Sequence, residues 1–577
     1  MLPFPRMLYA VLALASGAAD RSSTIAVTDS GARVLVANAD SMSVSVIEAT
    51  ARKTIAEIQV GATAQTVTTR GSEAFAACAD GRVAVLDLEL LRVKRAARVG
   101  TEPFGIVADG DRLFVSDHGA SRVLVIDAGT LEVIRSIATA EYPRGLALDG
   151  QAKRLYVTHF RSGQITVIDT ESLSTVKTIS TGADSNLSQS ITLHGGRAYL
   201  PQTRSNASNP ALLFDTTIFP IVSVVDLDAG QSLPQASFAI DVVDQPVSMP
   251  FDSVVTSSGK LYVAHAGSDD LSVIDVAGRR RVAHLAVGSN PRGVALSPDE
   301  RFVYINNALS GTVSLIDTAT DQVVETIPVT SIPLPPDLLN GKILFHTSAR
   351  TTLARDKWIS CAACHFDGGA DGRTWFFRDG PRNTPALFGV SSTLPMHWSG
   401  DLDELQDVEN TIRVVQAGTG LAQGPSHCEI ACDQDPPNAG RSKDLDDLAR
   451  FMASLRAPRR TTTRSDAANR GELLFNDART GCASCHVPPL YTDHERHDVG
   501  TAISPQERKG SSFDTPSLRG LFDTAPYFHD GSAATLFDVL ARHFGSSLTP
   551  GEQNDVVEFL RSIPFPSAPS RRRAVGR

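Results

Sequence analysis

The chain has 577 residues, of which 42% are hydrophobic and 20% are charged, and its net charge is −10. Single hydrophobic cores stop growing near ~250–300 residues, so we expect two or three domains. The acidic balance without basic clusters argues against a nucleic-acid partner, and no apolar run of about 18 residues follows the N-terminus, so we expect no membrane span.

Residues 1–19 are predicted to be a signal peptide. Arg6 supplies a positive charge, an apolar stretch runs from Met7 to Ala15, and small residues suited to cleavage stand at Ala15 and Ala18. We therefore expect export to the periplasm. At the other end of the chain, residues 567–577 form a short basic tail that we expect to be disordered.

Residues 20–334 are predicted to form a β-propeller. An alternating apolar stretch that ends in an acid recurs seven times, as in VSVIE, VLVID and VSLID. The acids are Glu48, Asp87, Asp127, Asp169, Asp226, Asp275 and Asp317. Each interval of roughly 40 to 57 residues corresponds to one blade, so about seven blades are expected. The repeat resembles YVTN-type propellers, which is specific for fold and weak for function.

The longest interval, from Asp169 to Asp226, contains an insertion, RSNASNPALLFDTTIFP, which should project from one face of the ring. A proline-rich stretch, IPVTSIPLPPDLLNG, then ends the repeat pattern, and we place the boundary at residue 334.

Helical periodicity replaces strand alternation beyond this boundary. Apolar residues recur at helical spacing in 443–455 and again in 548–563, where Thr549 and Glu552 have capping-box spacing. The stretch 456–471 is predicted to be a linker between two units.

Two C-x-x-C-H motifs, CAACH and CASCH, predict two covalently bound haem c groups. Two thiols one helical turn apart can form thioethers with both vinyl groups, and the adjacent histidine then ligates the iron. The attachment residues are Cys361, Cys364, Cys482 and Cys485, with His365 and His486 as axial ligands. The expected fold is thus a propeller followed by two mainly α-helical cytochrome c domains, residues 335–460 and 461–566.

The surroundings of the two motifs are duplicated. GKILF precedes the first motif and GELLF the second, and NTPALFG and DTPSLRG follow them. From Thr384 to Pro395 is 11 residues, as is the step from Thr515 to Pro526. The copies therefore align without gaps through LPMHWSGDLDELQDV and APYFHDGSAATLFDV.

On these residues, the chain from Gly341 to Ile563 resembles the bacterial di-haem cytochrome c peroxidase family, which includes the methylamine-utilisation di-haem enzyme. The resemblance implies an oxidoreductase in which one haem binds hydrogen peroxide and the other accepts electrons. It implies a redox partner protein, such as a small cytochrome or cupredoxin, or a protein substrate, with the propeller as a candidate docking surface. It also implies that Trp398, in MHWSGD, lies between the haems, and that calcium is a further candidate cofactor, with no ligands that the sequence identifies.

The chain departs from the family at the distal ligands. Phe528 stands where the family's second domain carries methionine or tyrosine, and phenylalanine cannot bind iron. His397 stands opposite Phe528 in the internal alignment, so we predict His397 as the second axial ligand of the first haem, with Met396 as the adjacent alternative. The second haem is then expected to have an open or weakly held site.

Peroxide cleavage also needs a group that moves a proton between the two oxygens. The candidates for this distal or acid–base role are Tyr527, His529, His543 and Glu409. Cys428 and Cys432 are a candidate disulfide pair, and the remaining cysteine, Cys78, is expected to be a buried small hydrophobe.

Two other functions are compatible with these residues. The first is non-catalytic electron transfer, with both irons six-coordinate and the propeller as a docking platform. The second places catalysis in the propeller, as in quinoprotein-like dehydrogenases, although the seven repeats show no evident cofactor constellation. An open iron site would separate the peroxidase from the electron-transfer protein.

Overall fold

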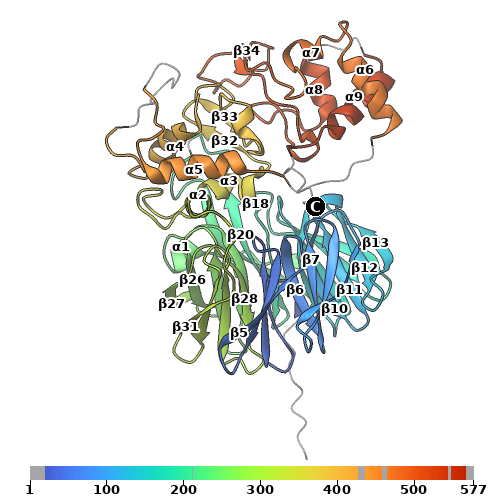
Figure 1. The fold of residues 1–577 in the computed structure, drawn as a ribbon, viewed down its shortest axis with the longest axis vertical. Helices are drawn as coiled ribbons and strands as arrows, with labels where there is room; N and C mark the ends of the chain where they lie inside the picture. Colours follow the sequence, from blue (N-terminus) through green and yellow to red (C-terminus); the bar gives the residue numbers. More distant parts are fainter. Residues whose placement is uncertain (1–19, 211, 426–435, 458–463, 544–547, 567–577) are drawn as a thin grey trace, which may run out of the picture.

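The computed structural model describes residues 20–210, 212–425, 436–457, 464–543 and 548–566. It consists of a β-propeller and a mainly helical part that lies against one face of the ring (Figure 1). Seven antiparallel sheets form the ring, so the prediction of about seven blades is confirmed.

Each blade is built mainly from one continuous stretch of chain, to which blade 4 adds the N-terminal strand β1 (Asp20–Arg21). The first strands of each stretch lie nearest the axis. Blades 1 and 2 contain β2 (Ile25–Val27), β3 (Arg33–Asn38), β4 (Ser43–Glu48), β5 (Lys53–Gln59), β6 (Ala64–Arg70), β7 (Glu73–Cys78), β8 (Arg82–Asp87) and β9 (Arg92–Arg98). Blades 3 and 4 contain β10 (Pro103–Asp109), β11 (Arg112–Asp117), β12 (Arg122–Asp127), β13 (Val133–Ala138), β14 (Pro143–Asp149), β15 (Arg154–His159), β16 (Gln164–Asp169) and β17 (Ser174–Ser180).

Blade 5 is the irregular one. It contains β18 (Ser185–Asn186), β19 (Thr192–His194), β20 (Arg197–Ser205), β21 (Ile218–Asp226), β22 (Gln231–Ser232) and β23 (Phe238–Ala239), followed by α1 (Ile240–Val243). Blades 6 and 7 contain β24 (Pro250–Val255), β25 (Lys260–His265), β26 (Asp270–Asp275), β27 (Arg280–Ala286), β28 (Pro291–Leu296), β29 (Phe302–Asn307), β30 (Thr312–Asp317) and β31 (Gln322–Pro328).

The repeated acids explain the blade motif. Each is the last residue of the strand that precedes the outermost strand of its blade, from Glu48 in β4 to Asp317 in β30. Each accepts hydrogen bonds from backbone N–H groups two or three residues later, as Asp169 does from Glu171 (3.0 Å) and Ser172 (2.7 Å). These bonds lower the pKa of Asp169 to about 2. The motif therefore encodes the turn that starts the outermost strand.

The start of the described chain fills part of the central channel. Strand β1 (Asp20–Arg21) pairs with β14, on the axial side of blade 4. From there Arg21 forms an ion pair with the buried Asp252 of blade 6 (2.5 Å), which also accepts a hydrogen bond from Ser23 (2.6 Å). The channel is thus crossed by the protein's own residues.

The helical part contains two similar halves. The first has α2 (Pro336–His346), α3 (Cys361–Cys364), β32 (Thr374–Phe377), β33 (Gly380–Asn383), α4 (Val408–Val414) and α5 (Lys443–Ser454). The second has α6 (Asp466–Phe475), α7 (Cys482–Cys485), β34 (Arg496–His497), β35 (Phe513–Asp514), α8 (Leu536–His543) and α9 (Pro550–Ser562). Both helices expected from periodicity are confirmed as α5 and α9, and Thr549 with Glu552 forms the expected capping box of α9.

The predicted linker 456–471 is wrong in its second part. Its residues from Asp466 onward belong to α6, because Ser465 caps the helix by accepting a hydrogen bond from the Ala468 N–H (3.1 Å). Among the residues that the structure describes, no helix has the length and apolar content needed to cross a membrane.

In both halves the first helix crosses the last one at a glycine. A Cβ added to Gly341 in α2 would lie 1.9 Å from the Asp447 carbonyl oxygen of α5, and one added to Gly471 in α6 would lie 1.9 Å from the Asp555 oxygen of α9. Equivalent phenylalanine pairs flank the crossings, for example Phe345 and Phe451 with ring centres 5.3 Å apart. The duplicated sequence therefore gives a duplicated helix crossing.

We expect Gly341→Ala to destabilise the helical part by about 3 kcal/mol, because the backbones of α2 and α5 must separate to admit the methyl group. Gly551→Ala in the first turn of α9 is the matched control, since a Cβ there meets nothing within 4 Å. Chemical denaturation followed by helical circular dichroism measures the difference. Equal midpoints for the two variants would contradict the close crossing.

The helical part and the propeller share one hydrophobic core. Phe366, just after the first motif, packs against Phe160 and Phe251 of the propeller, with ring centres 5.1 and 6.1 Å apart. The insertion in blade 5 contacts the first half, where the Leu212 N–H donates a hydrogen bond to the Phe376 carbonyl (3.0 Å). The first half is therefore held by the propeller face.

Candidate haem-binding site

Both C-x-x-C-H motifs form a single helical turn, α3 and α7, and the histidine follows directly as the C-cap residue. Their four cysteines are free thiols, so the pairs are not joined as disulfides. Burial raises the pKa of Cys361 to about 11, which keeps that thiol protonated at neutral pH. Each turn thus presents two thiols and one imidazole from adjacent positions.

The two motif histidines are oriented by backbone carbonyls. His365 Nδ1 lies 2.9 Å from the Pro385 oxygen, and His486 Nδ1 lies 3.1 Å from the Tyr491 oxygen. A proton on Nδ1 leaves Nε2 as the free lone pair, which is the arrangement of metal-ligating histidines. Burial lowers the pKa of His365 to about 4 and also lowers that of His486, so both rings are neutral and able to ligate.

One cavity of about 770 Å³ is lined by both motifs and by apolar side chains of both halves. Its wall includes the four thiols, His365, His397, Trp398, His486, Phe528 and His543. Covalent haem needs paired thiols, a neutral imidazole and an apolar enclosure. The residues present therefore fit haem c at both motifs.

The gapless internal alignment has a structural counterpart. His397 and Phe528, the aligned pair, both adopt left-handed backbone conformations with φ of 67° and 66°. The residues before them, Met396 and Tyr527, form equivalent isolated bridges to Leu402 and Ala533. The two turns therefore present His397 and Phe528 in the same way.

His397 is fixed by a carboxylate. Its Nδ1 lies 3.0 Å from Asp401 Oδ1, and Asp401 also accepts a hydrogen bond from Lys509 of the second half (2.7 Å). The His397 side chain lines the cavity. His397 thus resembles the motif histidines in having Nδ1 engaged. Its neighbour Met396 is buried and lines the same cavity.

The second half offers other groups near its motif. The phenol of Tyr527 donates a hydrogen bond to the Leu521 carbonyl (2.7 Å), and burial raises its pKa to about 12. His543, at the end of α8, has its ring centre 6.2 Å from that of His486 and 6.1 Å from that of Phe528. Burial, with a contribution from His486, lowers the pKa of His543 to about 4.

The remaining candidates differ in their position relative to the cavity, because His529 lines it and Glu409 does not. Glu409 is not among the residues that line the cavity, since its carboxylate accepts hydrogen bonds from Arg413 and from the N–H groups of Leu421 and Ala422. His529 is buried at the junction of the two halves. Cys428 and Cys432 lie outside the described residues, and Cys78 is buried as expected.

Trp398 connects the two halves. It lines the cavity, its Nε1 donates to the Asn383 carbonyl (2.8 Å), and its own carbonyl accepts from the Asp514 N–H of the second half (2.9 Å). Its ring meets that of His529 at 6.4 Å and 66°, an edge-to-face contact. Trp398 is therefore placed at the contact between the halves that carry the motifs.

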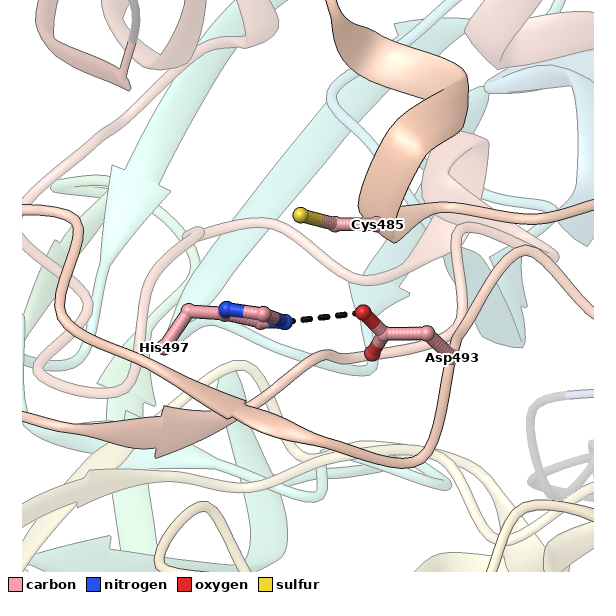
Figure 2. Close-up of side chains that lie close together, drawn as sticks. All are labelled: Cys485, Asp493 and His497. Carbon is pink, nitrogen blue, oxygen red and sulfur yellow. Dashed lines mark hydrogen bonds and ion pairs between the residues drawn. The ribbon is translucent and has the colours of Figure 1, made fainter.

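Sequence reasoning missed a group beside the second motif. Cys485, Asp493 and His497 lie together, with potential ligand atoms all within 4.8 Å of one another, and His497 Nε2 is 2.8 Å from Asp493 Oδ2 (Figure 2). Their types fit a metal ion. However, a thioether at Cys485 would use the sulfur, so this group competes with haem attachment. The four-residue Asp–His spacing, also seen in His397 and Asp401, is the signal that could have revealed it.

Asn383, at the junction of the two halves, has a buried side-chain oxygen that could face calcium. Asn383 Oδ1 is buried without a hydrogen-bond partner, and the same amide donates to the Pro526 carbonyl across the junction. With the amide rotated, Asn383 Oδ1 and Pro526 O would both face a cation. Calcium takes 6–8 oxygen ligands, so water would have to complete the shell.

The propeller holds both halves by ion pairs. Arg292 of blade 7 binds both carboxylate oxygens of Asp367 (2.6 and 2.9 Å), two residues after His365. Arg161 of blade 4 donates to the Ala370 carbonyl (3.1 Å) and lies 3.7 Å from Asp523 of the second half. These contacts fix the motif-bearing parts against the ring.

Comparison with known proteins finds relatives that match about 40% of the chain. The chain is 27% identical over 285 residues to the methylamine utilization protein MauG of Methylorubrum extorquens, covering 40% of this chain and 79% of that protein. It is 27% identical over 284 residues to the cytochrome c peroxidase Ccp of Escherichia coli, covering 41% of this chain and 61% of that protein.

Two further comparisons complete the findings. The family model described as cytochrome D1 heme domain matches residues 223–336, which run from β21 to the start of α2. Among solved structures, hydrazine synthase of Kuenenia stuttgartiensis is 22% identical, with a TM-score of 0.47, covering 52% of this chain and 95% of that one.

Proposed function

We propose that this chain is a periplasmic di-haem c-type oxidoreductase of the cytochrome c peroxidase type. The observation that carries the proposal is the pair of C-x-x-C-H turns whose histidines, held at Nδ1, share one apolar cavity. The similarity to a cytochrome c peroxidase and to MauG supports it. The proposed units are the propeller, residues 20–334, and cytochrome c domains at 335–460 and 461–566.

The chain's own residues attach and orient the cofactors. Cys361 and Cys364 would hold one haem, Cys482 and Cys485 would hold the other, and His365 and His486 would bind the irons. When bound, the haems supply the electron-transfer and peroxide chemistry. His397 is the proposed second ligand at the first site, because Asp401 engages Nδ1 and leaves Nε2 for a metal.

The second site is the proposed place of peroxide reduction. Phe528 offers no ligand atom there, and the Tyr527 phenol is kept protonated and hydrogen bonded to a carbonyl. His543 is the group best placed to move a proton between peroxide oxygens, since burial keeps its imidazole neutral near His486. Trp398 is the proposed connection between the sites.

We assign the propeller the role of a structural support that positions the two domains. Its face towards the helical part is engaged by Arg292, Arg161 and the shared aromatic core. A redox partner, a small cytochrome or cupredoxin, would then dock on the helical part rather than on that face. Calcium at Asn383 would brace the junction between the domains.

A peroxide titration tests the function. One molecule of hydrogen peroxide takes up two electrons and two protons to give two water molecules, so one equivalent should oxidise both haems of the fully reduced protein. Absorption at the haem bands measures this stoichiometry. Reduced haems that persist in excess peroxide would instead indicate a protein that only transfers electrons.

A further inference from the structure

The two C-x-x-C-H turns differ in what surrounds them. Phe366 follows the first motif and is buried against Phe160 and Phe251 of the propeller. Val487 follows the second motif and is 43% exposed. Within the turns, α3 contains two buried alanines, whereas every residue of α7 is at least partly exposed. The propeller therefore encloses the first motif and leaves the second partly exposed.

Arg144 of β14 brings a positive charge into this enclosed contact. It is 8% exposed. Its guanidinium carbon lies 3.9 Å from the ring centre of Phe160, 4.6 Å from that of Phe104 and 5.0 Å from that of Phe366. Aromatic faces attract a cation, and the attraction is stronger where water is excluded. Since Phe366 directly follows His365, the three rings hold the charge beside the first motif.

The charge of Arg144 is only weakly offset by its neighbours. Nη1 donates a hydrogen bond to the neutral Gln189 Oε1 (2.6 Å), whereas Asp367 and Glu102 act on the guanidinium through longer-range attraction. Burial lowers the pKa of Arg144 to about 10, so the side chain stays charged at neutral pH. The field of a buried charge is screened less than that of an exposed one. Arg144 can therefore act on a group bound at the first motif.

A second arginine also faces the ring of Phe366. Arg292 of blade 7 lies 5.1 Å from the ring centre, and it forms an ion pair with Asp367 (2.6 Å). The carboxylate offsets the charge of Arg292 at short range. Arg144 has no such partner on this ring, so its charge is the one whose removal should be felt most.

We propose that Arg144 raises the reduction potential of the first haem and leaves that of the second haem unchanged. This inference rests on the proposed di-haem function. Oxidation from ferrous to ferric adds one positive charge at the iron, so a nearby buried cation disfavours the ferric form. In the step concerned, a reductant gives one electron to ferric iron, and no bond is made or broken. The propeller would thus tune one site as well as support it.

Redox titration followed at the haem bands tests the proposal, at pH 6. It is run on the holoprotein and on the Cys482→Ala/Cys485→Ala variant, in which the first haem stands alone. Arg144→Gln should lower the potential of the first haem by about 60 mV, which corresponds to a tenfold shift of a one-electron equilibrium. Arg144→Met is a second neutral variant, whose flexible apolar side chain fits among aromatic rings. It should have the same effect.

Two variants separate the charge from packing. Arg144→Lys should keep the potential, because the charge remains; pH 6 is chosen because a buried lysine loses its proton more readily than arginine. Arg301→Gln should change neither haem. Arg301 also lies over an aromatic ring, that of Phe302 at 5.0 Å, but it is exposed and its charge is screened by solvent.

The inference is overturned if both neutral variants hold two haems at unaltered potentials, while peroxide reduction in the same samples would leave the proposed function standing. It is also overturned if Arg144→Lys lowers the potential as much as Arg144→Gln, because Arg144 would then be only a packing residue. An equal fall at both haems would contradict an effect confined to the first. Should the protein ignore peroxide yet show the expected shifts, the peroxidase function fails and the role of Arg144 stands.

Discussion

The double variant Cys482→Ala/Cys485→Ala is expected to carry one covalent haem where the unaltered protein carries two. Both thioethers of the second site come from α7, and no other described cysteine lies in that turn. Intact mass after acid–acetone extraction measures the change in protein made with a competent haem-attachment system. The second site should then lose its absorbance while the first remains.

Matched variants make this result specific. Cys361→Ala/Cys364→Ala should remove the other haem, and Cys78→Ala, which changes a buried cysteine of β7, should remove neither. If Cys485, Asp493 and His497 instead held a metal ion (Figure 2), the α7 variant would lose that ion and no haem mass. That outcome would refute the di-haem assignment.

The variant His397→Gly is expected to convert one low-spin ferric signal to high-spin and to raise the potential of the first haem by about 0.1–0.2 V. The imidazole favours ferric iron, so its loss favours reduction. Electron paramagnetic resonance and a redox titration measure the two effects. Asp401→Asn should weaken the same ligation less, because it removes only the partner of Nδ1.

Phe528→Met is the counterpart at the second site. It places a thioether at the position equivalent to His397, so the second haem should become low-spin and react more slowly with peroxide. Peroxidase activity that falls in Phe528→Met and survives in His397→Gly would place the oxidant at the second haem. The reverse pattern, or an unchanged low-spin signal in His397→Gly, would contradict the proposed division of roles.

The sequence predicted the features that depend on neighbours in the chain. The seven acids identified the blades because each carboxylate bonds the turn that immediately follows it, as Asp169 does. Spacing alone also predicted the C-x-x-C-H turns, the α9 capping box and the equivalence of His397 with Phe528. The prediction of a linker at 456–471 was wrong in its second part because the helix cap at Ser465 was not recognised.

Only the tertiary structure decided what depends on segments far apart in the chain. Duplication indicated that Trp398 and His529 are equivalent, but not that a two-fold contact would bring them together beside Glu507. Likewise, nothing local in Arg292 or Asp367 indicates that the propeller holds the turn after His365. Hydrogen bonds between neighbouring residues require a fixed spacing, so the sequence shows them. Contacts across domains depend on how whole surfaces pack, and no short motif indicates that packing.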